Sequence, residues 1–297
     1  MKLLQGLFCL VILASCSVHK KVTDLSAVKW IHGAAECASN KDVDIQIVRY
    51  DATTWILRQN KCSHYEAPFL FLLLGKDRAI LMDSGASGDE KLFPLYETVR
   101  KLIATQTKAS DQLLPLILAH THNHSDHKAG DKQFENKPGI TVVGVEVADV
   151  QSFFQLTNWP LQNGQIDLGD RKIDIIPIPG HEKASIALYD HNTKILLTGD
   201  SFYSGRLYIN DWLSYQESIS RLTLFAQKHQ VKYILGNHIE MTSQPGVDYP
   251  VGTKFQPDEP GLVLYVKDLE LLHSSLQKLG ANPARKIHDR FIIYPSK

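Results

Sequence analysis

Directly after an apolar run, LLPLILA, residues 120–130 read HTHNHSDHKAG. The run predicts a buried strand. Because alternate residues of a strand share a face, His122 and His124 are expected to point the same way. Where the chain then turns, Asp126 and His127 can point towards a neighbouring position. Imidazole and carboxylate groups are ligands of Zn²⁺ and similar metals. Four such groups in six residues favour a metal-binding loop over a polar loop that happens to be rich in histidine.

The order His-x-His-x-Asp-His after a strand resembles the metallo-β-lactamase superfamily. The motif fits in one register only, because starting it at His120 would require an aspartate at position 124, which is a histidine. His120 is therefore interpreted as a strand-end or supporting residue. The resemblance implies an α/β fold, an αββα sandwich of two mixed β-sheets flanked by helices.

Later parts of the chain resemble the other elements of this superfamily, in the same order. They are Asp83-Ser84-Gly85, Pro179-Gly180-His181 followed by Ser185, Gly199-Asp200, and Gly236-Asn237-His238. The resemblance implies that one metal is held by His122, His124 and His181. It implies a second metal at Asp126, His127 and His238, with Asp200 bridging the two ions. Asp83 is expected to support the metal-binding loop without touching a metal.

This ligand set implies two divalent ions, Zn²⁺ in the first place with Fe or Mn as alternatives. Two ions that share a hydroxide provide a nucleophile near neutral pH. Asp126 is expected to orient that hydroxide and pass its proton to the leaving group. The expected reaction is hydrolysis of a carbonyl–heteroatom bond in a small-molecule substrate.

The type of bond that is hydrolysed is predicted from fewer residues. A bridging Asp200 argues against a true β-lactamase, and His124 argues against the di-iron oxygen reductases of the superfamily. Tyr203 lies three residues after Asp200, a spacing that resembles the acyl-homoserine lactonases, whose tyrosine binds the substrate carbonyl. A packing role for Tyr203 is an equal alternative. A lactone or ester is therefore favoured, with a β-lactam or a thioester, as in glyoxalase II, as alternatives. A mononuclear iron dioxygenase and a non-catalytic zinc-binding protein remain as other classes.

The N-terminus predicts export. Residues 1–15 have the short apolar run of a signal peptide, and Leu13-Ala14-Ser15-Cys16 resembles a bacterial lipobox. Cleavage before Cys16 and lipidation of its thiol would give an outer-membrane lipoprotein facing the periplasm, with a soluble periplasmic protein as the second interpretation. Residues 16–24 are interpreted as a linker, and 25–297 as a single domain.

The remaining cysteines are informative in an oxidising compartment. Cys37 and Cys62 flank a predicted hairpin over 44–58, so antiparallel pairing would bring them together. A disulfide is expected there, with two buried thiols as the alternative. The chain has 32 basic and 32 acidic residues and shows no basic stripe, so its charge pattern gives no reason to expect nucleic-acid binding.

The remaining patterns predict the other elements of the fold. Strands are expected at 69–74, 79–82, 140–145, 165–168, 173–177, 186–189, 195–198, 233–235 and 290–294. Helices are expected at 92–105, 147–155, 214–229 and 269–279, with a Pro- and Gly-rich loop at 240–261 near the metals.

Overall fold

The computed structural model describes residues 22–106 and 113–296, so the predicted signal peptide and the lipidation site Cys16 lie outside the described residues. The first sheet has six strands in sequential order. They are β1 (Ile45–Arg49), β2 (Thr54–Gln59), β3 (Phe69–Leu74), β4 (Ala79–Met82), β5 (Leu116–Ala119) and β6 (Ile140–Val142). The first four pair antiparallel, and β4, β5 and β6 run parallel.

A second sheet has five strands in the order β12-β10-β9-β8-β7. They are β7 (Gly164–Asp167), β8 (Lys172–Pro177), β9 (Ile186–Asp190), β10 (Ile195–Gly199) and β12 (Tyr233–Gly236). Only the β10–β12 pair is parallel, so this sheet is also mixed. A third, small sheet joins β11 (Arg206–Ile209), β14 (Ile292–Pro295) and β13 (Lys286–Ile287).

The two large sheets face each other across the central core. Along β3, Phe69 and Phe71 belong to this core, whereas Leu70 and Leu72 face the opposite side of the sheet. Successive residues of a strand point to opposite faces, so a strand covered on both faces is a continuous apolar run. This is why the run at 69–74 is buried throughout.

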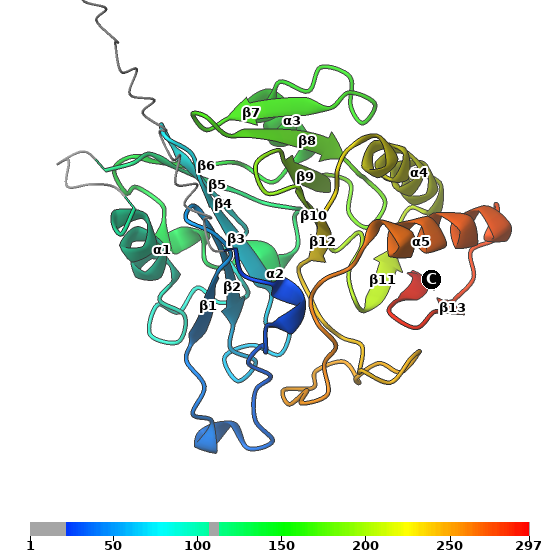
Figure 1. The fold of residues 1–297 in the computed structure, drawn as a ribbon, viewed down its shortest axis with the longest axis horizontal. Coiled ribbons are helices and arrows are strands. Elements are labelled where there is room, and N and C mark those ends of the chain that lie inside the picture. Colours follow the sequence, from blue (N-terminus) through cyan, green and yellow to red (C-terminus); the bar gives the residue numbers. More distant parts are fainter. Residues whose placement is uncertain (1–21, 107–112, 297) are drawn as a thin grey trace, which may run out of the picture.

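Helices cover the outer faces. They are α1 (Leu95–Ala104) on the six-stranded sheet, and α4 (Trp212–Lys228) and α5 (Val266–Leu279) on the five-stranded sheet. Figure 1 shows this order of layers, with α1 on one side and α4 and α5 on the other. The predicted αββα sandwich is thereby confirmed. Two shorter helices, α2 (Ser125–Lys128) and α3 (Val147–Phe154), lie in the connections.

A buried ion pair joins the sheets at one end of the sandwich. Arg171, in the turn between β7 and β8, binds the Asp190 carboxylate at 2.6 Å and 3.2 Å. The same guanidinium donates to the carbonyl oxygens of Thr53 and Leu74 on the six-stranded sheet. Leu74 pairs with Ala79 at the start of β4, so this clamp lies at the opposite end from Met82 and the predicted metal loop.

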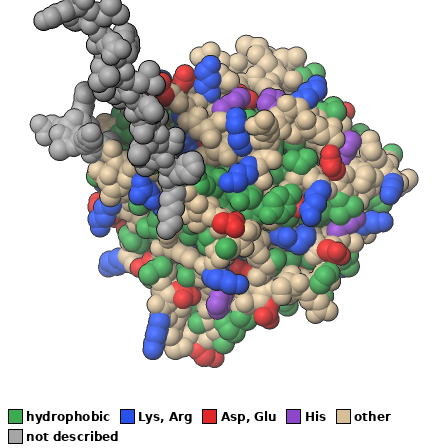
Figure 2. Space-filling view, viewed as in Figure 1, with side chains coloured by type: hydrophobic (Ala, Val, Ile, Leu, Met, Phe, Trp, Pro, Cys, Tyr) green, Lys and Arg blue, Asp and Glu red, His purple; other side chains and the backbone are tan. Residues whose placement is uncertain are grey.

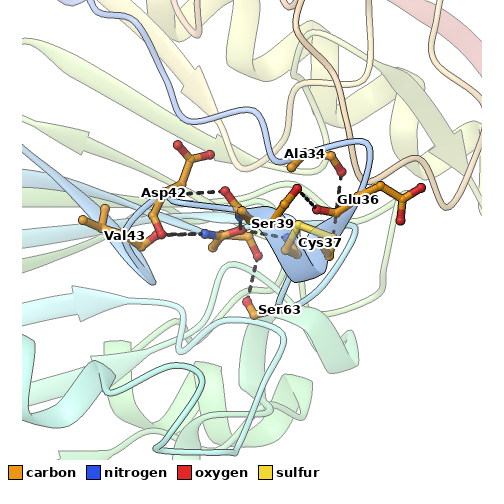
Figure 3. The surroundings of a disulfide bond; sticks show 10 residues. Ala34, Glu36, Cys37, Ser39, Asp42, Val43 and Ser63 are labelled. Atoms are coloured by element: carbon orange, nitrogen blue, oxygen red, sulfur yellow. Dashed lines mark hydrogen bonds between the residues drawn. A yellow bond between two sulfur atoms is a disulfide. The ribbon is translucent and has the colours of Figure 1, made fainter.

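Cys37 and Cys62 are joined by a disulfide that ties the 3-10 helix at Cys37–Ser39 to the loop after β2, with a Cα–Cα distance of 5.3 Å. Figure 3 shows Cys37 among Ser39, Asp42, Val43 and Ser63. The neighbouring Asn60 accepts from the Cys62 backbone N–H at 2.8 Å, and its amide donates to the Val43 carbonyl at 3.0 Å. The loop of residues 60–68 is therefore anchored at its start by a covalent bond and by hydrogen bonds.

The exterior has no single-sign charge field on the face shown in Figure 2, where Lys and Arg side chains alternate with Asp and Glu. This agrees with the equal numbers of basic and acidic residues in the chain. Among the described residues, no helix has the length and apolar character that a membrane span requires.

Candidate metal centre

The predicted ligands all follow the carboxyl ends of strands at one end of the sandwich. Strands β4 and β5 of the first sheet are parallel, and they lead to Asp83 and to the histidine-rich loop. In the second sheet, β8, β10 and β12 run in one direction and lead to His181, Asp200 and His238. Parallel strands end at the same edge of a sheet, so residues far apart in sequence meet there.

Short local structures aim these side chains. His124 is the N-cap of the single-turn helix α2, which carries Asp126 and His127. Before His181, Gly180 has φ +139°, and a Cβ atom there would lie 2.4 Å from the Tyr215 backbone. Only glycine fits this close approach, which explains the Pro-Gly pair that precedes the histidine.

The first group of ligands consists of His122, His124 and His181. The His124 Nδ1 atom lies 3.0 Å from His122 Nε2 and 3.1 Å from His181 Nε2. On its other side, the His181 ring donates through Nδ1 to the Tyr208 carbonyl at 2.7 Å. That hydrogen bond fixes the tautomer, so the lone pair of Nε2 faces the group.

The second group consists of Asp126, His127, Asp200 and His238. The Asp126 Oδ2 atom lies 3.1 Å from His127 Nε2 and 3.2 Å from His238 Nε2. Asp200 lies between the two groups: its Oδ2 is 3.5 Å from His127 Nε2 and 3.9 Å from both His122 Nε2 and His181 Nε2. The structure thus gathers every predicted ligand, with Asp200 where the bridging residue is expected.

This donor set fits divalent cations. Three ring nitrogens converge in the first group within hydrogen-bond distance, and hydrogen bonds from one another cannot satisfy all of them because each neutral imidazole carries only one N–H. In the second group, the buried Asp200 Oδ1 lies 3.3 Å from His238 Nε2 but makes no well-formed hydrogen bond among the described residues. A metal ion would accept the free lone pairs of both groups. The His and Asp clusters therefore imply divalent metals.

The charges of the metal-free site are strongly coupled. Burial alone would lower the pKa of His127, but Asp126, Asp200 and Asp83 outweigh it and raise that pKa well above the usual value. His238 is raised in the same way. Burial would raise the pKa of Asp200, yet the two histidines hold it well below its usual range. Without a metal, the imidazoles and carboxylates of the second group therefore favour each other's charged forms.

Asp83 contacts three residues around the ligands. Its fully buried carboxylate accepts from the Thr121 backbone N–H at 2.8 Å and from the Asn237 amide at 2.6 Å. It also lies 3.2 Å from His127 Nδ1. One carboxylate therefore joins the loop after β5 to the residue preceding His238.

Of the two interpretations of Tyr203, the contacts of its side chain favour the packing role. Its hydroxyl is buried and donates to the Arg206 carbonyl at 2.5 Å, with Glu240 Oε2 at 3.0 Å. Only the ring packs near a ligand, edge-on to His238 with centroids 5.6 Å apart. Because the hydroxyl is already held by protein groups, it is not available to a substrate carbonyl.

Three supporting groups were not identified in the sequence. Thr121 and Asn237 hold Asp83, and the Glu66 carbonyl accepts from His238 Nδ1 at 3.1 Å. Thr121 and Asn237 each stand directly before a predicted ligand in the sequence, and that position could have identified them. Glu66 acts through its backbone carbonyl, which every residue has, so the sequence gives no sign of its role. His120 is not among the metal-ligating groups; its Nε2 lies 2.9 Å from Asp131 Oδ1.

The model of the family described as the metallo-beta-lactamase superfamily matches residues 68–287, a range that includes every ligand described above. The chain belongs to the metallo-beta-lactamase superfamily. Among curated relatives, the chicken (Gallus gallus) protein named acyl-coenzyme A thioesterase MBLAC2 is 28% identical over 209 residues, covering 58% of this chain and 72% of that protein. A hydroxyacylglutathione hydrolase from Nostoc punctiforme is 29% identical over 161 residues, covering 46% of this chain and 60% of that protein.

Solved structures share the superfamily fold. A metallo-beta-lactamase from Pontibacter korlensis aligns with a TM-score of 0.50 at 18% identity, covering 78% of this chain and 99% of that one. The DIM-1 metallo-beta-lactamase aligns with a TM-score of 0.53 at 13% identity, covering 81% and 100%. At this level of identity the likeness concerns the fold alone.

Proposed function

We propose that this protein is a metal-dependent hydrolase that cleaves thioesters at a binuclear centre. The observation that carries the proposal is the position of Asp200, whose carboxylate lies between the first group of ligands and the second. A set with a shared carboxylate suits two ions side by side. When bound, such ions would polarise the scissile carbonyl and supply hydroxide near neutral pH.

The chain's own residues would then position the reactants and move one proton. The five histidines, Asp126 and Asp200 would hold the ions, and the buried Asp126 carboxylate would also orient the attacking water and accept its proton. Water adds its oxygen to the carbonyl carbon, the C–S bond breaks, and the proton passes from Asp126 to the departing sulfur. The products are a carboxylic acid and a thiol.

The preference for a thioester replaces the lactone or ester favoured from the sequence. The lactone rested on Tyr203, whose hydroxyl is occupied by Arg206 and Glu240. The relatives named above are hydrolases of thioesters by their printed names, an acyl-coenzyme A thioesterase and a hydroxyacylglutathione hydrolase. The first observation removes the support for a lactone, and the second favours sulfur as the leaving atom. The intact donor set and the hydrolytic relatives also favour hydrolysis over an iron dioxygenase or a non-catalytic zinc-binding protein.

We also propose that the protein acts as an exported lipoprotein, anchored through Cys16 and facing the periplasm. The support is the lipobox-like Leu13-Ala14-Ser15-Cys16 together with a Cys37–Cys62 disulfide, which suits an oxidising compartment. Fractionation of cells that make the wild type and Cys16→Ser tests this. Retention of both proteins in the cytoplasm would contradict it.

The catalytic proposal is tested with an acyl thioester, an aryl ester, an acyl-homoserine lactone and a cephalosporin at equal concentration. Metal-loaded protein is expected to hydrolyse the thioester fastest and to lose this activity with a chelator. His181→Ala and Asp200→Asn are expected to abolish turnover while the far-ultraviolet circular dichroism stays unchanged. Preference for the cephalosporin, or normal turnover in either variant, would contradict the proposal.

A further inference from the structure

Lys61 is a buried cation beside the metal centre that the proposed chemistry does not use. It lies in the loop of residues 60–68 between β2 and β3, and its side chain is 2% exposed. The same loop provides the Glu66 carbonyl that orients His238. Lys61 is thus held within the structure that positions a metal ligand.

The carboxylates of Glu259, Glu240 and Glu66 all act on the positive charge of Lys61, but burial and the charge of Arg58 outweigh them. The nearest acidic partner, Glu259, is engaged by Arg58, which binds both of its oxygens at 2.5 Å and 2.7 Å. The Lys61 ammonium is 3.9 Å from Glu259, beyond hydrogen-bond distance, and it donates to the Tyr65 carbonyl at 3.0 Å. An ammonium has three N–H donors, so capacity for a further acceptor remains. Burial, followed by the charge of Arg58, lowers the pKa of Lys61 to about 8.

Lys61 lines a small cavity of about 20 Å³ that is also lined by the metal ligand His238 and by Glu66 and Glu240. The Glu240 carboxylate is held by Arg206, and the Glu66 carboxylate accepts from the Tyr65 hydroxyl. This volume is somewhat larger than one water needs, so it admits a small polar group rather than a chain. Gln256 is on the same cavity wall, 4% exposed, and its Oε1 has no hydrogen-bond partner among the described residues. A side-chain amide can turn its NH₂ donors to the same point.

Arg206, which also lines this cavity, already has its hydrogen-bond donors paired with protein groups. Arg206 binds Glu240 at 2.9 Å and Asp248 at 2.6 Å, and it also donates to the Tyr208 hydroxyl and the Tyr249 carbonyl. Arg206 therefore has its donors engaged by the protein, whereas Lys61 retains free donors next to His238.

We propose that Lys61 and Gln256 form a subsite that binds a carboxylate carried by the acyl part of the substrate. The inference rests on the proposed function and deepens it, because it names the substrate class: thioesters of short dicarboxylic acids. The scissile carbonyl would lie at the metals while the distal carboxylate reaches Lys61 across the wall formed by His238. An apolar acyl chain of the same length would leave a buried ammonium with unused donors, which is unfavourable.

The test compares three thioesters of one thiol: succinyl, its methyl ester, and butyryl. Wild-type protein is expected to show kcat/KM for the succinyl thioester about 10–100-fold above the two neutral substrates, the effect of one charge-assisted hydrogen bond. Lys61→Met keeps the length of the side chain and removes its charge. It is expected to lose this preference, so that the ratio of kcat/KM for the succinyl substrate to kcat/KM for the neutral substrates falls to about one. Lys76→Met, at an exposed turn on the opposite end of the sandwich, is the matched control.

A second measurement does not depend on turnover. Succinate is titrated calorimetrically into the metal-loaded wild type and Lys61→Met, and the variant is expected to bind it about tenfold more weakly. If Lys61→Met does not fold, Gln256→Glu provides a carboxylate that competes for Lys61, and the succinyl preference should again disappear. If no thioester is hydrolysed, the proposed function fails and the titration alone decides the subsite. Equal kcat/KM values for the three substrates in the wild type, or unchanged succinate binding in Lys61→Met, would overturn the inference.

Discussion

The substitution Asp83→Asn isolates the support of the metal centre from the metal ligands themselves. The carboxylate is completely buried and accepts hydrogen bonds from the Thr121 backbone, the Thr121 hydroxyl and the Asn237 amide, with His127 Nδ1 at 3.2 Å. Asparagine has the same size, so no cavity forms. It has only one acceptor oxygen, however, and its NH₂ group must face at least one buried donor.

The size of the effect follows from these contacts. One buried donor without an acceptor costs about 1–3 kcal/mol of stability. The His127 ring also loses the carboxylate that fixes its orientation. Loss of such a partner lowers metal affinity about 10–100-fold. The expected outcome is a moderate loss of stability together with a marked loss of affinity for the metal held by the second group.

The matched control is Asp190→Asn. Asp190 is also a buried carboxylate, but it pairs with Arg171 at the other end of the sandwich. Leaving that guanidinium buried and unpaired costs about 3–5 kcal/mol. Thermal unfolding of the metal-free proteins and competition of the metal-loaded proteins with a chromophoric chelator measure the two quantities. Asp190→Asn should reduce stability without changing metal affinity. If Asp83→Asn binds both metals as tightly as the wild type, the role assigned to Asp83 is refuted.

Three further predictions concern the site and the loop beside it. Tyr203→Phe should lower the free energy of unfolding by about 1 kcal/mol and leave kcat on a thioester within about threefold; a hundredfold fall in kcat would restore a substrate-binding role for the hydroxyl. The pKa values of His127 and His238 are raised well above 6.5, so we expect both imidazoles to be protonated at neutral pH in the metal-free protein. Metal loading should therefore release protons, and metal affinity should fall as the pH is lowered. Equal heats of metal binding in buffers of different ionisation enthalpy would contradict this. Reduction of Cys37–Cys62 should cost about 2–4 kcal/mol, and it should also weaken metal binding because the loop after Cys62 holds His238; unchanged affinity after reduction would separate the disulfide from the site.

The sequence predicts those parts of the fold in which the residues of a single segment already show that it is buried. The runs at 69–74 and 79–82 are apolar at every position because both faces of the sheet are covered, and β3 and β4 have these bounds. Strand β6 is shorter than predicted, ending at Val142 instead of residue 145, and α5 begins at Val266, three residues earlier than predicted. Segment ends depend on partners that a local pattern does not contain.

The third sheet was not predicted for the same reason. Strand β11 begins at Arg206, in a stretch that resembled no substrate-specific pattern, and it exists because Arg206 to Ile209 pair with Ile292 to Pro295. Nothing within four residues indicates a partner more than eighty positions later. The sequence could not decide between the two interpretations of Tyr203 for the same reason, because its hydroxyl is held by the Arg206 carbonyl at the start of that strand.

The metal centre was more predictable than its surroundings, and the chemistry of its ligands explains why. Because a metal requires particular side chains, His122, His124 and Asp126 can be recognised as candidate ligands by their residue type and spacing. Residues that tune the centre need only one polar atom at the right place, and Glu66 provides that atom from its backbone. The burial of Lys61 could not be predicted either. A lysine after a strand is ordinarily a solvated surface charge, and only the fold places this one in a cavity lined by His238. Under the proposed subsite, variants at Lys61 are expected to change substrate specificity, whereas variants at the ligands are expected to change metal content.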